Sequence, residues 1–176
     1  RVTWWTLLEH RRTILNAYIQ RIHDVRVQLT VSDKRLMADN PLAVSIKRDL
    51  EVLHLPDDVI RQHRAEPFVM KLYLIEARLT AGLEQLESFS GNPGSHTTHP
   101  WEYKSEDAFV DDLRLLRESL IAANAGVLVS SGPLASLWQQ AKTFGFHLAA
   151  LDIRQHSDVH EVAIGELLYV AGVLTS

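Results

Sequence analysis

The stretch "FGFHLAALDIRQHS", residues 144–157, decides the fold class, because it is the segment most typical of a β-strand. Most positions from 146 to 153 are apolar, without the spacing of three and four that marks an amphipathic helix. Continuous apolarity is typical of a parallel strand that is covered on both faces. The sequence therefore predicts a buried strand near residues 146–154, with Asp152 and Arg154 at its downstream end.

The remainder of the chain is predicted to be helical. Along residues 3–29, Leu15, Tyr18 and Ile22 recur at spacings of three and four, which places them on one apolar stripe. Gly, Pro, Ser and Thr gather at residues 90–104, which predicts a long loop. Helices are expected over residues 3–29, 41–54, 56–63, 67–89 and 133–144, from Ser105 onward, and from Ser157 or Asp158 onward.

A single strand needs neighbours, because its backbone N–H and C=O groups must find hydrogen-bond partners. The helix–strand–helix order around residues 146–154 fits one unit of a βα-barrel. We therefore expect a mainly α fold: a helical fragment with one βα unit that belongs to a larger α/β (TIM-type) barrel. Residues 1–176 are expected to form one such fragment, with both ends continuing into a longer polypeptide.

Composition indicates a globular protein and disfavours several partners. Hydrophobic residues make up 46% and charged residues 23% of the 176 residues, as in ordinary soluble domains. The net charge is −4 and basic residues are spread along the chain, which disfavours a nucleic-acid or membrane surface. No cysteine is present, so disulfides and thiolate metal sites are excluded. A cytoplasmic location is the natural expectation.

Arg154 is the strongest candidate for a functional residue. In a barrel, functional side chains sit where strands end, and a guanidinium there can bind a phosphate or carboxylate through two parallel hydrogen bonds. The alternative is an ion pair with Asp152, two residues back on the same face. Spacing alone favours the ion pair, because such pairs are common at strand ends.

A metal site is not expected within this chain. His156 and His160 are four residues apart and Glu161 follows, but His156 precedes the predicted helix, so the two rings need not share a face. Zinc usually takes three or four protein ligands, and no further ligand is spaced to match. Nucleotide-binding glycine loops, nucleophile elbows and zinc-protease motifs are absent from the sequence.

The segment "FGFHLAALDIRQHSDVHEVAIGELL", residues 144–168, resembles phosphoenolpyruvate carboxylases, which carry a Phe-Gly…Leu-Asp-Ile-Arg-Gln-(Glu/His)-Ser motif followed by a histidine and a helix. Two upstream segments resemble the same family in the same order: "EPFVMKLYLIEARL" (66–79) and "FVDDLRLLRESL" (109–120), the latter followed by "SGPLASLWQQAKTFG" (131–145). The resemblance covers roughly residues 60–170. It implies that the chain is an internal piece of this larger barrel enzyme.

The resemblance also implies a function and site residues. Members of the family carboxylate phosphoenolpyruvate with bicarbonate, giving oxaloacetate and phosphate, with magnesium or manganese and usually as homotetramers. Their motif arginine binds phosphoenolpyruvate, which makes Arg154 the expected substrate-binding residue. The family's His-Pro-Thr segment, its glycine- and arginine-rich loop and its metal-binding acids are absent, so no catalytic or metal-binding residue is expected here. The alternative is a non-catalytic helical scaffold or interaction module.

Overall fold

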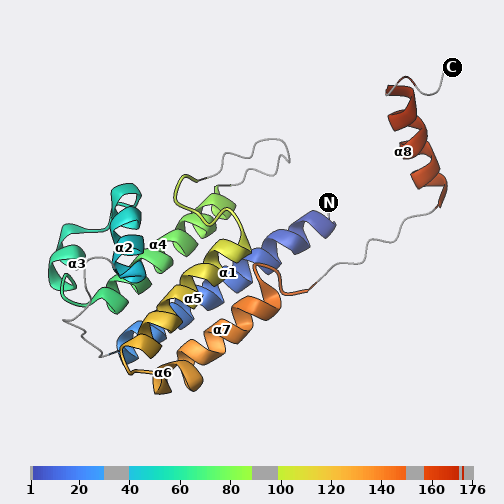
Figure 1. Ribbon diagram of the computed structural model, residues 1–176. Coiled ribbons are helices and arrows are strands. Elements are labelled where there is room, and N and C mark those ends of the chain that lie inside the picture. Colours follow the sequence, from blue (N-terminus) through green and yellow to red (C-terminus); the bar gives the residue numbers. More distant parts are fainter. Residues whose placement is uncertain (1, 30–39, 89–98, 150–156, 171, 173–176) are drawn as a thin grey trace.

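The computed structural model describes residues 2–29, 40–88, 99–149, 157–170 and 172 (Figure 1). Helices account for most of these residues, no strand lies among them, and none of the helices is long and apolar enough to cross a membrane. The expectation of a mainly α chain is confirmed. In chain order the helices are α1 (Val2–Gln28), α2 (Pro41–Val52), α3 (Asp57–Gln62), α4 (Pro67–Glu87), α5 (Glu106–Ala122), α6 (Val127–Ser130), α7 (Pro133–Phe144) and α8 (Ser157–Val170).

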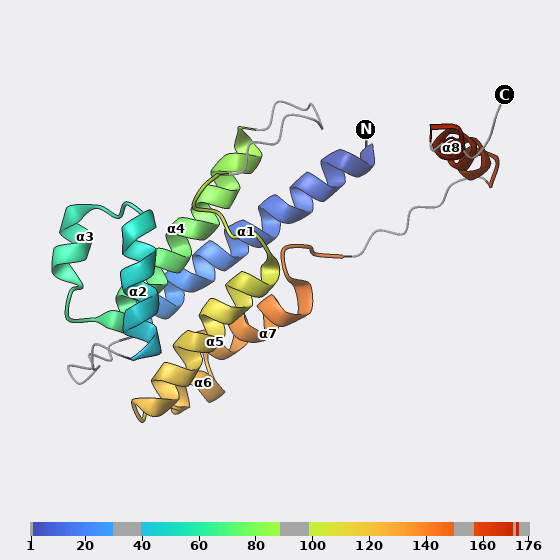
Figure 2. The same cartoon turned by 45° about the horizontal axis from the view of Figure 1, so that its top comes forward.

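Helices α1, α4, α5 and α7 lie side by side as a bundle, and α2 packs against α4 and α5 (Figures 1 and 2). Tyr18 and Ile22 of α1 and Leu72 of α4 are fully buried, as the apolar stripes of these helices predict. In both views α8 stands apart from the bundle, and apolar residues such as Leu167 on it are exposed. The core therefore lies within α1–α7.

Two predicted helix starts are confirmed by their capping side chains. Asn40 Oδ1 accepts a hydrogen bond from the Leu42 N–H at 2.8 Å, and Pro41 takes the first helical position of α2. Ser105 Oγ accepts from the Ala108 N–H at 3.2 Å at the start of α5. The short helix α6 was not predicted, because four residues are too few to show a helical period.

The predicted strand at 146–154 is wrong for its first four residues. Residues 146–149 form a turn and irregular backbone after α7, and residues 150–154 lie outside the described residues. The physical reason is the turn at Gly145, whose φ of +51° redirects the chain. The His147 N–H then donates to the Phe144 carbonyl at 2.9 Å, and Phe146 turns back into the core.

Candidate functional site

The residues predicted from the sequence are only partly described. Arg154, Asp152 and His156 lie outside the described residues. His160 and Glu161 lie on α8, where Glu161 is exposed. Within the described ranges, no three His, Cys, Asp or Glu side chains are grouped so that they could hold a metal ion. The structure instead brings together a cluster of charged side chains inside the bundle and a cluster of aromatic side chains at the end of α7.

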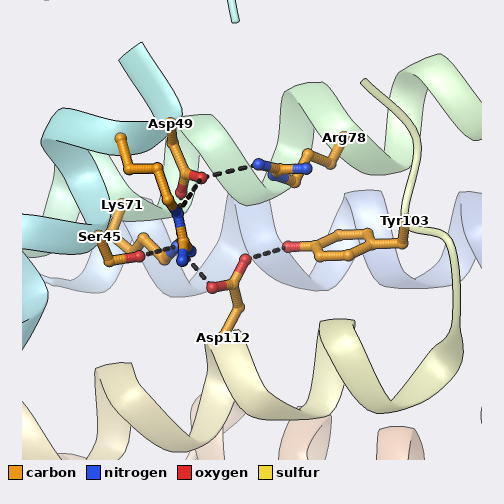
Figure 3. Close-up of polar contacts among 7 residues, drawn as sticks. Ser45, Asp49, Lys71, Arg78, Tyr103 and Asp112 are labelled. Atoms are coloured by element: carbon orange, nitrogen blue, oxygen red, sulfur yellow. Dashed lines mark hydrogen bonds and ion pairs between the residues drawn. The ribbon is translucent and has the colours of Figure 1, made fainter. Parts of the chain in front are cut away.

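A cluster of charged side chains lies between α2, α4 and α5 (Figure 3). At its centre is Lys71 of α4, which has no exposed surface. The Lys71 ammonium donates to Asp49 Oδ2 at 2.7 Å and to Asp112 Oδ1 at 2.6 Å. It also donates to Ser45 Oγ at 2.9 Å. All three ammonium protons therefore have acceptors, and α4 is bound to both of its neighbours.

Two further side chains complete this buried charge cluster. Arg78 donates to Asp49 Oδ1 at 2.7 Å, and the Tyr103 hydroxyl donates to Asp112 Oδ2 at 2.7 Å (Figure 3). Two cations thus face two carboxylates, which is how proteins make buried charges tolerable. The Arg78 Nε atom is buried and has no hydrogen-bond partner among the described residues.

Electrostatics fix the protonation states of Asp49 and Tyr103. Burial by itself raises the pKa of Asp49, but its hydrogen bonds and charge interactions with Lys71 and Arg78 bring that pKa below its ordinary value. Burial, and then the neighbouring Asp112 carboxylate, raise the pKa of Tyr103 well above its ordinary value. Asp49 is therefore ionised and Tyr103 protonated at neutral pH. Neither is suited to exchange protons there, so the cluster serves to hold the helices together.

The sequence carries a signal for this cluster, namely charged residues on the apolar faces of two helices. Lys71 and Arg78 are seven residues apart and lie on the apolar face of α4, where Phe68 and Leu72 also lie. Asp49 similarly lies on the face of α2 that carries buried Leu42. Charged residues on the buried stripes of two neighbouring helices indicate a buried ion pair.

The last described residues before 150 are anchored to the bundle by aromatic side chains. The buried Tyr18 of α1 donates its hydroxyl hydrogen bond to the Gly145 carbonyl at 2.7 Å. Phe146 is buried, with its ring stacked on Phe109 at a centroid distance of 5.7 Å. Its ring also lies 6.4 Å from that of Tyr103. This aromatic anchor immediately precedes the segment that contains Arg154.

Comparison with known proteins places the whole chain in one family. The family described as phosphoenolpyruvate carboxylase has a model that matches residues 1–176. The chain belongs to the phosphoenolpyruvate carboxylase family.

Relatives named phosphoenolpyruvate carboxylase match nearly the whole length of this chain. The phosphoenolpyruvate carboxylase of Rhodothermus marinus is 40% identical over 172 residues, covering 98% of this chain and 18% of the relative. That of Ralstonia nicotianae is 36% identical over 162 residues, covering 91% of this chain and 15% of the relative. That of Parasynechococcus marenigrum is 33% identical over 186 residues, covering 94% of this chain and 18% of the relative. The chain therefore spans less than a fifth of the length of these phosphoenolpyruvate carboxylases.

The family match also covers the part of the chain around Arg154. Residues 150–156, which include the Asp-Ile-Arg-Gln sequence at 152–155, fall within the matched range 1–176. The buried charge cluster and the aromatic anchor therefore belong to the same piece of this family as the motif. The cluster holds α4 to α2 and α5, and the anchor holds the end of α7 to α1.

Proposed function

We propose that this chain is part of a phosphoenolpyruvate carboxylase and that it contributes Arg154 to the binding of phosphoenolpyruvate. The complete enzyme joins bicarbonate to phosphoenolpyruvate and releases oxaloacetate and phosphate. The observation that carries this proposal is the family match over residues 1–176, which includes the Asp-Ile-Arg-Gln motif. Because the chain covers 18% or less of these relatives, we assign the acid–base groups to the remainder of the enzyme.

The chemistry of arginine suits the proposed role. Its guanidinium is planar and permanently charged, and it presents two parallel N–H donors to the oxygens of a phosphate. We propose that Arg154 lies at the end of a strand in a TIM-type barrel of the complete enzyme, where substrates of such barrels bind. There it would hold the phosphate while carboxylation proceeds at the neighbouring carbon.

The metal of the complete enzyme is proposed to be magnesium or manganese, held outside this chain. Both ions prefer oxygen ligands, so carboxylates would be their ligands in this chain. The buried Asp49 and the largely buried Asp112 do not fit, because Lys71 bonds to both of them and Arg78 bonds to Asp49. We therefore assign no metal-binding role to the described residues.

The assembly and location follow from the proposed enzyme. We propose a homotetramer in the cytoplasm, acting on phosphoenolpyruvate and bicarbonate and binding neither nucleic acid nor membrane. The net charge of −4 with dispersed basic residues supports the absence of a nucleic-acid partner. Sedimentation of the complete enzyme tests the assembly, and a species other than the tetramer contradicts it.

Substitution of Arg154 in the complete enzyme tests the proposed function. Arg154→Ala should lower kcat/KM for phosphoenolpyruvate by about ten- to a hundredfold, the worth of a hydrogen bond to a charged group. Arg154→Lys should recover part of this loss, because lysine restores the charge but not the planar fork. The KM for bicarbonate should change less.

The alternatives predict different results for the same variants. If Arg154 only forms an ion pair with Asp152, or if the chain is only a scaffold, Arg154→Ala should lower the melting temperature and leave the kinetics nearly unchanged. Steady-state kinetics and thermal unfolding of the same preparations distinguish these alternatives from substrate binding. A destabilised Arg154→Ala enzyme with unchanged kcat/KM refutes the substrate-binding role.

A further inference from the structure

We infer that Tyr18, Gly145 and Phe146 are positioning residues for Arg154, because they fix the chain eight residues before it. This inference rests on the proposed function and extends it to side chains that do not touch the substrate. It stands on three independent features of the structure: a buried hydroxyl, a glycine-specific turn and an enclosed aromatic ring.

The buried hydroxyl belongs to Tyr18, in the middle of α1. Its single hydrogen is donated to the Gly145 carbonyl at 2.7 Å, and the Gln140 carbonyl at 3.2 Å is a second, weaker acceptor. The Gln140 carbonyl lies in the last turns of α7, and the Gly145 carbonyl lies just beyond the helix, where no intrahelical N–H is available to it. Burial, with a smaller contribution from Glu106, raises the pKa of Tyr18 to about 12, so it remains a donor throughout the neutral range. Tyr18 of α1 therefore fixes the backbone at the point where the chain leaves α7.

The turn at Gly145 accepts no other residue without strain. Its φ of +51° and ψ of −125° lie in a region that side chains with a Cβ avoid. A Cβ added there would also lie 2.6 Å from the Glu106 carboxylate. The direction in which the chain leaves α7 is therefore set by this glycine.

The ring of Phe146 is enclosed on several sides. It lies against Phe109, Tyr103 and Tyr18, with centroid distances of 5.7, 6.4 and 6.5 Å. The Arg11 guanidinium lies 5.5 Å from the ring centroid. A cavity of only about 10 Å³ remains beside it, too small to give the ring an alternative place. The packing around Phe146 therefore fixes the position of the backbone after α7, while Gly145 fixes its direction.

Among the described residues before the motif, Phe146 is the last one that is buried. The described residues after Phe146, at 147–149, are all exposed. Eight residues reach at most about 26–29 Å even when fully extended, so the anchor limits where Arg154 can lie. A displacement of about 1 Å in a substrate-positioning group can cost about a hundredfold in rate. Loosening the anchor should therefore weaken phosphoenolpyruvate binding without any contact to the substrate.

The experiment uses the complete enzyme with Tyr18→Phe, Gly145→Ala and Phe146→Leu. For Tyr18→Phe, which removes one oxygen, we expect the KM for phosphoenolpyruvate to rise about two- to tenfold, while bicarbonate KM changes little. Leu74→Ala is the matched control, because Leu74 is fully buried but belongs to a separate apolar cluster with Leu53 and Met70. It should lower the melting temperature and leave the KM for phosphoenolpyruvate unchanged.

Combination with Arg154→Ala decides whether the anchor acts through Arg154. In that background Tyr18→Phe should cause no further rise in KM, because the group that it positions is gone. Additive effects overturn the inference, as does an unchanged KM in folded Tyr18→Phe and Phe146→Leu. If Arg154→Ala itself leaves the kinetics unchanged, the proposed function fails instead. Should Gly145→Ala not fold, Tyr18→Phe and Phe146→Leu still decide the outcome.

Discussion

Replacing Lys71 by methionine removes the central cation of the buried charge cluster and keeps a side chain of similar length. Asp49 would still be paired with Arg78, but Asp112 would lose its ammonium partner and keep only the Tyr103 hydroxyl. The Asp49 side chain is 1% exposed and that of Asp112 13% exposed, so water cannot fully replace the lost partner. The variant therefore leaves one largely buried carboxylate without a cation.

The expected loss of stability follows from this geometry. Breaking a buried pair by removing one partner costs about 3–5 kcal/mol, because the other charge is left uncompensated. The lower end applies here, since Arg78 still serves Asp49 and Asp112 retains slight contact with solvent. We expect a loss of about 3 kcal/mol in the free energy of unfolding.

Urea unfolding of the 176-residue chain, followed by helical circular dichroism, measures this loss. With a slope of about 1–3 kcal/mol per molar urea, the midpoint should fall by about 1 M or more. Arg114→Met is the matched control, since Arg114 bonds to Asp111 at the same kind of distance, 2.8 Å, but both side chains are more than half exposed. That variant should cost less than about 1 kcal/mol.

Two results would refute this reasoning. One is a Lys71→Met variant whose unfolding free energy lies as close to that of the parent as the Arg114→Met control does. The other concerns the double variant with Asp112→Leu, which removes the stranded carboxylate and should regain part of the loss. If the double variant lost as much unfolding free energy as the two single variants together, Lys71 and Asp112 would not interact.

Two further predictions concern pH and activity. Because the pKa of Asp49 is lowered in the folded state, the stability that this carboxylate contributes is present above its ordinary pKa and is lost as pH falls through the folded value. Urea midpoints should therefore fall below about pH 4, and less steeply in Asp49→Asn; parallel profiles would contradict this. The 176-residue chain alone should form no oxaloacetate from phosphoenolpyruvate and bicarbonate, because reacting groups must be positioned together. Turnover by a preparation free of complete enzyme would overturn that expectation.

The sequence predicted the helices well because each long helix carries its own apolar period and several carry their own start signals. Asn40 before Pro41 is such a local signal, and the structure confirms it. The exit from α7 was predicted wrongly because the turn at Gly145 is stabilised by contacts that are distant in the sequence. Tyr18 is 127 residues away from Gly145, and an apolar run gives no sign that Phe146 turns back into a niche between helices. Long-range packing there overrode the local strand pattern.

Tyr103 connects the buried charge cluster to the aromatic anchor. Its hydroxyl donates to Asp112, while its ring lies 5.4 Å from that of Phe109 and 6.4 Å from that of Phe146. Its raised pKa keeps the hydroxyl protonated, so this link persists across the neutral range. The charges that bind α4 to α5 thus also fix one wall of the niche that holds Phe146. Lys71 therefore stabilises the bundle directly beside the niche that holds Phe146.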